Sequence, residues 1–148
     1  MAVLVYISPI PKQTVPRSGI GLRLTGVERC SSGWWMRTIN LELGRPTVEE
    51  ARKRLRLELD RARREGVTLL KIIHGWGSSG VGGRLGVAIR KSLHLRRKEG
   101  HVRLVVIGER FSGDTLEGRE LAQRHPSIRA DVDFNRANPG ITIVELAR

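Results

Sequence analysis

A short apolar run, TLLKIIH at residues 68–74, lies between two segments of helical periodicity and constrains the fold more than any other feature. The helix predicted before it starts at a capping box of Thr47 and Glu50 and ends near Gly66. Its apolar positions are spaced by three and four residues: Val48, Ala51, Leu55, Leu59 and Ala62. A second helix is predicted over residues 83–97. Because the apolar run has the length of a buried strand, the pattern predicts a sheet covered by helices.

The remaining predicted elements alternate in type along the chain. Strands are predicted over residues 2–7, 20–27, 34–42, 101–109, 128–134 and 141–146, and a third helix over 114–125 with Asp114 as its cap. From residue 34 the predicted order is β-α-β-α-β-α-β-β. This order indicates the α/β class, as a two-layer sandwich in which helices cover a mixed sheet.

Length and composition bound the domain organisation. The chain has 148 residues, which is the size of one domain, and 39% of them are hydrophobic, enough for a packed core. We expect residues 1–33 to form an N-terminal extension with short strands and residues 34–148 to form the main α/β domain. No apolar run approaches the roughly 18 residues of a transmembrane helix.

The charge balance restricts the partners that the chain can bind. Its 27 Lys and Arg residues against 15 Asp and Glu residues give a net charge of +12. A bias of this size favours polyanions, first nucleic acid and second an anionic membrane surface. We expect nucleic acid, DNA or RNA, as the partner and no membrane; the oligomeric state is left open.

No cofactor or metal ion is predicted. Cys30 is the only cysteine, which excludes an internal disulfide and a cysteine-rich metal site and suits the cytoplasm. The four histidines show no metal-binding spacing. Asp131 and Asp133 share one face of a predicted strand, as in some magnesium sites, although ordinary edge-strand charges explain them more simply.

A glycine-rich loop, GWGSSGVGG, follows the buried strand and leads into the second helix. Such a loop aims free backbone N–H groups at one point, so we expect an anion site there. The Lys-Ser/Thr pair of a phosphate-binding P-loop is missing. Gly75, Gly77 and Gly80 match a dinucleotide-binding pattern, but the next acidic candidate, Glu109, comes too late and too little chain follows it.

Two side chains beside the glycines, His74 and Trp76, are candidate functional residues, each with two interpretations. His74 ends the strand, where it is either an acid–base catalyst or a structural histidine bonded to the backbone. Trp76 lies between two glycines, where it is either a platform for stacking a base or a lid packed on the helix.

The second helix is the most basic surface, with no acidic residue between Arg84 and Arg97. The first helix has many cations too, but acids offset them, and pairs such as Glu49–Lys53 and Glu50–Arg54 indicate a solvated, salt-bridged face. We therefore predict that nucleic acid contacts the loop and the second helix, through Gly75, Trp76, Gly77, Ser78, Ser79, Gly80, Arg84, Arg90, Lys91 and Arg97.

These motifs together resemble the Smr (small MutS-related) domain family over residues 38–147. His74, Gly75 and Gly77 match its H-G-x-G motif, Thr47, Glu49, Glu50 and Ala51 match its helix opening T-x-E-E-A, and the ending TIVEL also fits. The family's first motif, L-D-x-H-G, is degraded: in one alignment Asn40 and Glu42 replace its Asp and His, and in the other, with Gly44 matched to its glycine, Leu41 and Leu43 do. A strand and a helix at about 98–124 read as an insertion.

The resemblance implies a fold similar to the C-terminal domain of translation initiation factor 3 and a role in binding nucleic acid. Several members of the family are nucleases, so an endonuclease acting on DNA or RNA is implied, with His74 and Glu42 as its catalytic residues. The alternatives are a small nucleotide-binding protein that uses the glycine loop, or a non-catalytic interaction module.

Overall fold

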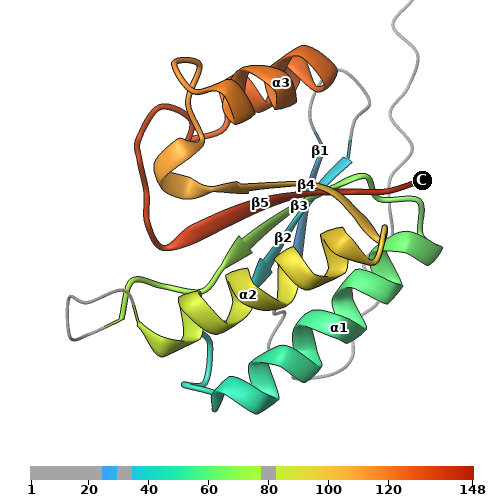
Figure 1. The fold of residues 1–148 in the computed structure, drawn as a ribbon, viewed down its shortest axis with the longest axis vertical. Coiled ribbons are helices and arrows are strands. Elements are labelled where there is room, and N and C mark those ends of the chain that lie inside the picture. Colours follow the sequence, from blue (N-terminus) through green and yellow to red (C-terminus); the bar gives the residue numbers. More distant parts are fainter. Residues whose placement is uncertain (1–24, 30–34, 78–82) are drawn as a thin grey trace, which may run out of the picture.

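The computed structural model describes residues 25–29, 35–77 and 83–148 (Figure 1). Five strands, three α-helices and two 3-10 helices occur within them. In chain order these are β1 (Thr25–Arg29), β2 (Trp35–Asn40), α1 (Val48–Arg64), β3 (Leu69–Ile73), α2 (Arg84–Lys98), β4 (Val102–Ile107), η1 (Gly108–Arg110), α3 (Leu116–Arg124), η2 (Pro126–Ala130) and β5 (Ile141–Leu146). The predicted strand 2–7 lies outside the described residues, and so do most of the 20–27 strand and Cys30.

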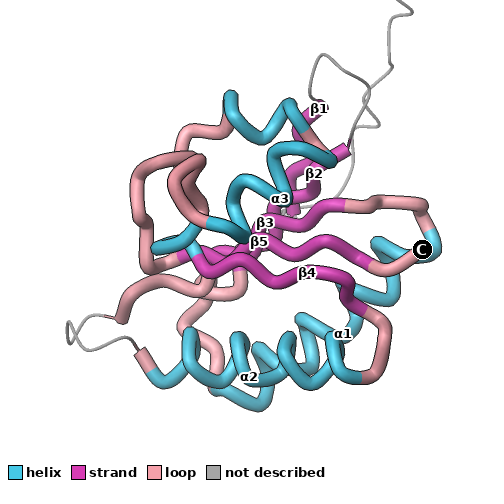
Figure 2. Tube along the Cα trace, turned by 45° about the horizontal axis from the view of Figure 1, so that its top comes forward, coloured by secondary structure: helices cyan, strands magenta, loops and turns pink. Residues whose placement is uncertain are grey.

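The five strands form one mixed sheet in the order β1-β2-β3-β5-β4 (Figures 1 and 2). β2 and β3 are parallel, whereas β5 is antiparallel to both of its neighbours, β3 and β4. The carboxyl ends of β2, β3 and β4 therefore meet at one edge of the sheet, beside the start of β5. Open α/β sheets bind ligands at such an edge.

Helices cover both faces of this sheet. α1 and α2 lie on one face, and α3 and η2 lie on the other (Figure 1). Two separate apolar clusters fill the two interfaces, one centred on Leu55, Ile72 and Ile89, the other on Leu104, Phe111 and Leu121. The mixed α/β class is confirmed. The helices on the second face, α3 and η2, add a layer to the predicted two-layer arrangement. They are needed because β5 is buried at all of its positions and must be packed on both sides.

Both central helices form where their periodicity predicts them. The capping box of α1 is confirmed: the Thr47 hydroxyl accepts from the backbone N–H of Glu50, and the Glu50 carboxylate accepts from the backbone N–H of Thr47 at 2.8 Å. α3 instead begins one residue later than predicted, because the hydroxyl of Thr115, and not Asp114, caps it by accepting from Gly118. β4 and α3 lie within residues 98–124. That this segment is an insertion, and that residues 1–33 form an extension, both stay predictions.

The predicted strand 128–134 is wrong. This segment forms η2 and a series of turns, so only one closing strand, β5, follows α3. The alternation arises because Ile128 packs into the core below α3, while Asp131 and Asp133 turn inward to a buried lysine, Lys71 of β3. Pro126 suits the first turn of η2, and positive φ at Asn135 and Ala137 breaks any extended run.

Among the described residues no helix has both the length and the apolar composition needed to cross a membrane.

Candidate functional site

The candidate site lies where the chain leaves β2, β3 and β4. Glu42 follows β2 by two residues, His74 directly follows β3, and Glu109 lies in η1 directly after β4. The amino-terminal end of α2 meets the same edge, because Gly83, its N-cap, donates its N–H to the carbonyl of Trp76 at 2.9 Å. Residues separated along the sequence thus share one edge of the sheet.

The imidazole of His74 is buried, with 3% of the residue exposed, and both of its nitrogens are engaged. Nδ1 lies 3.0 Å from the carbonyl oxygen of Gly75, which can only accept, so Nδ1 carries the proton. The hydroxyl of Thr142 then donates to Nε2 at 3.0 Å. Burial lowers the pKa of His74, and the positive charge of Arg90 adds to this, so the ring is neutral near neutral pH.

Backbone contacts tie His74 into three elements. The N–H groups of His74 and Gly75 both donate to the carbonyl of Gly140, each at 3.0 Å, just before β5. On the other side the ring lies against α2: a methyl group at Gly86 would be 2.9 Å from Nδ1 of His74. His74 therefore joins β3, β5 and α2, and it could transfer a proton to a ligand only by exchanging one of its two ring hydrogen bonds.

Gly75 and Gly77, beside His74, have positive φ and leave no space for a side chain. Gly75 has φ +71° and lies against the carboxylate of Glu42, which a side chain at Gly75 would approach to 2.5 Å. Gly77 has φ +83° and lies against Gly83, with only 2.9 Å between the Cα of Gly83 and a methyl group at Gly77. Gly77 and Gly83 thus form a narrow neck. Ser78, Ser79 and Gly80 lie outside the described residues.

Glu42 is exposed, and its carboxylate lies against Gly75. Its own N–H donates to the Asn40 side chain at 3.0 Å, which helps to turn the chain after β2. The fold therefore brings the two residues proposed as catalytic, Glu42 and His74, to either side of Gly75. Trp76 is 45% exposed at the same edge.

The predicted cations of α2 divide into two groups. Arg84, Lys91 and Arg97 are exposed. Arg90 is partly buried instead: it donates to both oxygens of Glu109, at 3.2 and 2.8 Å, and to the carbonyl of Pro139 at 2.9 Å. Arg90 therefore holds η1 and the segment before β5 against α2, and its guanidinium is already engaged.

A buried charge network supports the site from the other face of the sheet. Lys71 donates to Asp131 at 2.8 Å and pairs with Asp133, which in turn accepts from Asn138 at 2.8 Å. The Asn138 side chain then accepts from the N–H of Gly140 at 2.9 Å. Burial acts to lower the pKa of Lys71, but the two aspartates outweigh it and raise that pKa. The sequence did not predict this network; Lys71, a cation inside the buried apolar run, was a signal for it.

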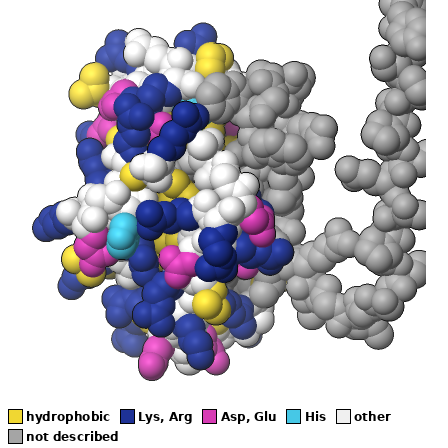
Figure 3. Space-filling model, turned by 90° about the vertical axis from the view of Figure 1, so that its right-hand side faces the viewer, with side chains coloured by type: hydrophobic (Ala, Val, Ile, Leu, Met, Phe, Trp, Pro, Cys, Tyr) yellow, Lys and Arg dark blue, Asp and Glu magenta, His cyan; other side chains and the backbone are white. Residues whose placement is uncertain are grey.

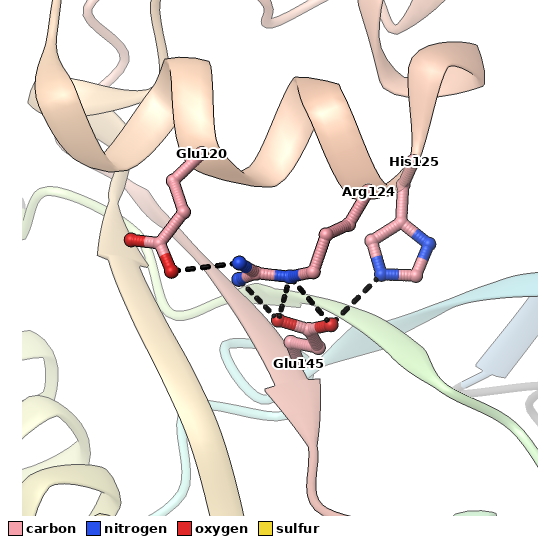
Figure 4. Close-up of polar contacts among 4 residues, drawn as sticks. All are labelled: Glu120, Arg124, His125 and Glu145. Carbon is pink, nitrogen blue, oxygen red and sulfur yellow. Dashed lines mark hydrogen bonds and ion pairs between the residues drawn. The ribbon is translucent and has the colours of Figure 1, made fainter.

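A second buried cluster joins α3 to β5 (Figure 4). Glu145 accepts three hydrogen bonds from the Arg124 side chain, the shortest at 2.7 Å, and its Oε1 also lies 3.0 Å from Nε2 of His125. Glu120 pairs with Arg124 on the outside at 2.7 Å. Burial acts to raise the pKa of Glu145, but Arg124 and His125 outweigh it and lower that pKa. Glu145 lies at the opposite end of β5 from Gly140, so the cluster anchors α3 away from the candidate site.

The described residues contain no group of three side chains that could hold a metal ion. Asp131 and Asp133, which the sequence allows either as a magnesium site or as ordinary edge-strand charges, lie in turns and both pair with Lys71.

Comparisons with known proteins point to one family. The profile described as the Smr domain matches residues 41–114, which is half of the chain. Among solved structures, the Smr domain of Thermus thermophilus MutS2 is similar with a TM-score of 0.45 and 24% sequence identity, over 75% of this chain and 98% of that one. No curated protein matches.

Proposed function

The chain belongs to the Smr domain family, and from that premise we propose that it binds nucleic acid through the amino-terminal end of α2 and the adjoining segment His74–Gly77. The family is associated with nucleic-acid binding and with nuclease activity. The proposal for this chain is more specific: the phosphate backbone contacts free N–H groups and exposed cations, while Trp76 stacks on a base.

The observation that carries this proposal is the amino-terminal end of α2. Its N-cap is Gly83, which offers no side-chain cap, and its first turn contains no acidic residue. Such an end attracts anions, because the helix dipole and the unpaired N–H groups point at the same place. Arg84 and Lys91 add exposed positive charge on the same helix, and residues 84–98 contain no acid to offset them.

A small nucleotide fits this edge less well than a nucleic-acid strand does. Dinucleotide-binding folds place their glycine loop in a parallel sheet, whereas antiparallel β5 lies between β3 and β4 here. The exposed cations also continue along α2 well beyond the reach of one pyrophosphate. An extended polyanion uses all of them.

Cleavage of the bound strand is a second candidate function, and the position of Glu42 favours it. An exposed carboxylate against Gly75 would accept the proton of an attacking oxygen, and Arg84 would stabilise charge on the phosphate. His74 would take part only by giving up its bond to Thr142 or to Gly75. Glu42 is therefore the first residue to substitute in a cleavage assay.

Binding is tested by titrating labelled single-stranded and duplex DNA and RNA into the protein at several salt concentrations. We expect log K to fall linearly with log salt, by about 0.7–0.9 per neutralised phosphate. The double variant Arg84→Gln/Lys91→Gln should bind about tenfold more weakly, since each cation contributes one phosphate contact. Arg119→Gln/Arg129→Gln, two exposed arginines of α3 and η2, is the matched control. A binding constant that does not change with salt would refute the proposal.

Cleavage is tested on the same substrates with repurified protein. If the chain is a nuclease, Glu42→Gln should lose about a hundredfold or more in rate while binding the substrate normally. Cleavage by Glu42→Gln at the parental rate would remove Glu42 from the mechanism. His74→Ala, checked for folding, addresses the histidine in the same way.

A further inference from the structure

A groove runs between α1 and α2 on the outer side of the domain, beyond the candidate site. One hollow of this groove has a volume of about 370 Å³, and a neighbouring one of about 420 Å³ shares Arg52, Ser92 and Leu95 with it. Six cations line the two hollows: Arg52, Lys53 and Arg56 of α1, and Lys91, Arg96 and Lys98 of α2. Only Glu49 and Glu99 oppose them among the lining residues.

Arg61 of α1 pairs with Glu65, but the groove cations of this helix, Arg52, Lys53 and Arg56, form no such pair and are free to bind a ligand, contrary to the interpretation of the helix as a salt-bridged face. Glu50 caps the helix at Thr47 and does not pair with Arg54, which donates to the Leu43 carbonyl. Lys53 forms no pair with Glu49. Within the parts of the chain that the structure describes, none of the six groove cations forms an ion pair. Unpaired cations of this kind retain their charge for a polyanion.

A line of cations connects the amino-terminal end of α2 to the groove. Arg84, Lys91 and Lys98 are exposed and spaced by seven residues, so they lie almost on one line along the helix, about 10 Å apart. This line starts beside Gly83 and ends at the groove, which Lys91 and Lys98 both line. In Figure 3, Lys and Arg side chains cover much of the described face, including the lower part, which carries α1 and α2.

We infer that a nucleic-acid strand held at the amino-terminal end of α2 continues along this helix and lies in the groove between α1 and α2, with its phosphates on the groove cations. Leu95, which is 58% exposed in the middle of the groove, offers an apolar surface for a sugar or a base face. A strand fits better than an acidic protein segment, because the cations recur at regular intervals in one line, as backbone phosphates do. This inference rests on the proposed function and assigns it a second contact region, which shares Lys91 with the first.

The test uses the full chain and the double variant Arg52→Gln/Arg56→Gln, whose two positions lie on α1 and leave the glycine loop and α2 intact. The control double variant Arg119→Gln/Arg129→Gln removes the same charge from the opposite side of the domain. Binding is measured with a four-nucleotide and a twenty-nucleotide strand at several salt concentrations. Unchanged thermal melting and circular dichroism show that each variant is folded.

For the long strand we expect the groove variant to bind about tenfold more weakly than the parent, with a salt slope smaller by about 1.5. The short strand, held at the amino-terminal end of α2, should bind both proteins equally, and the control should match the parent. Equal losses in the groove and control variants, or none in either, overturn the inference and leave the proposed function standing. Displacement of the strand by polyglutamate at equal charge also overturns it, since the groove would then select charge alone. A parent that binds no nucleic acid overturns both proposals.

Discussion

The imidazole of His74 leaves no room for a side chain at position 86 of α2. A methyl group at Gly86 would lie 2.9 Å from Nδ1 and 3.1 Å from Cε1 of the ring, which is fixed by hydrogen bonds at both nitrogens. The ring therefore requires glycine here, although glycine weakens a helix by about 1 kcal/mol relative to alanine. The two residues should behave as one unit under substitution.

We predict that Gly86→Ala lowers the free energy of unfolding of the parent by about 1 kcal/mol or more, because the clash outweighs the gain in helix propensity. In the background of His74→Ala, the same substitution should be stabilising by up to about 1 kcal/mol, since the ring is gone. Urea unfolding of the four proteins completes the cycle. A coupling energy near zero would show that the ring moves aside without cost.

The pKa of His74 gives stability a defined dependence on pH. Burial lowers the folded-state pKa below the usual value of about 6.5, so the unfolded chain binds a proton that the folded chain refuses. The contribution of His74 is therefore complete above about pH 6.5 and is lost as the pH falls below it, by at most about 1.4 kcal/mol per pH unit. Unfolding measured from pH 7.5 to 5 should show a smaller slope in His74→Asn than in the parent, and identical slopes would contradict the assignment.

At the scale of elements, a buried lysine connects β3 to the segment that precedes β5. Lys71 holds Asp131 and Asp133, and Asp133 reaches the Gly140 N–H through Asn138. The Gly140 carbonyl accepts from the N–H groups of His74 and Gly75. The charge of Lys71, on one face of the sheet, therefore helps to position the segment His74–Gly75 at the end of β3. Four side chains, those of Lys71, Asp131, Asp133 and Asn138, thus connect β3 to the turn that ends at Gly140.

Replacing Lys71 by Met should destabilise the protein by about 3–5 kcal/mol, because two aspartates would remain buried without their cation. Lys53→Met, on the exposed face of α1, is the control and should stay within about 0.5 kcal/mol of the parent. Hydrogen exchange tests the link to the site more specifically than overall stability does, since the amides of His74 and Gly75 should lose protection from exchange in Lys71→Met. Protection of these amides equal to that of the parent would disconnect the network from the loop.

At the scale of the whole molecule, positive charge dominates. A net charge of +12 on 148 residues makes the folded state repel itself, and the six groove cations form no ion pair among the described residues that would relieve this. We predict that raising sodium chloride from about 0.02 to 0.15 M stabilises the protein by about 1 kcal/mol, or about 2–4 °C in Tm, because screening relieves the repulsion. Scanning calorimetry measures this directly. A falling Tm over the same range would mean that the internal ion pairs outweigh the repulsion.

Much of the fold could be predicted from local pattern. The capping box of Thr47 and Glu50, the apolar stripe of α1, the buried strand β3 and the acid-free helix α2 all depend on residues within a few positions of one another. The strand predicted at 128–134 failed for the opposite reason: its alternation reflects contacts with Lys71 and α3, which periodicity alone cannot distinguish from a pleat.

The sequence by itself determined the helices, the central buried strand, the basic charge of α2 and the candidate residues at the H-G-x-G segment. Only the tertiary structure decided what surrounds them: Thr142 bonds to His74 across 68 positions of sequence, Asp131 to Lys71 across 60, and Arg90 turns inward to Glu109 and Pro139. It also aligned the cations of α1 with those of α2 in one groove. The physical reason is that capping and amphipathicity depend on residues close together in the sequence. The partners of a side chain that is buried or lines the groove depend instead on the order of the strands in the sheet and on how the helices pack against it.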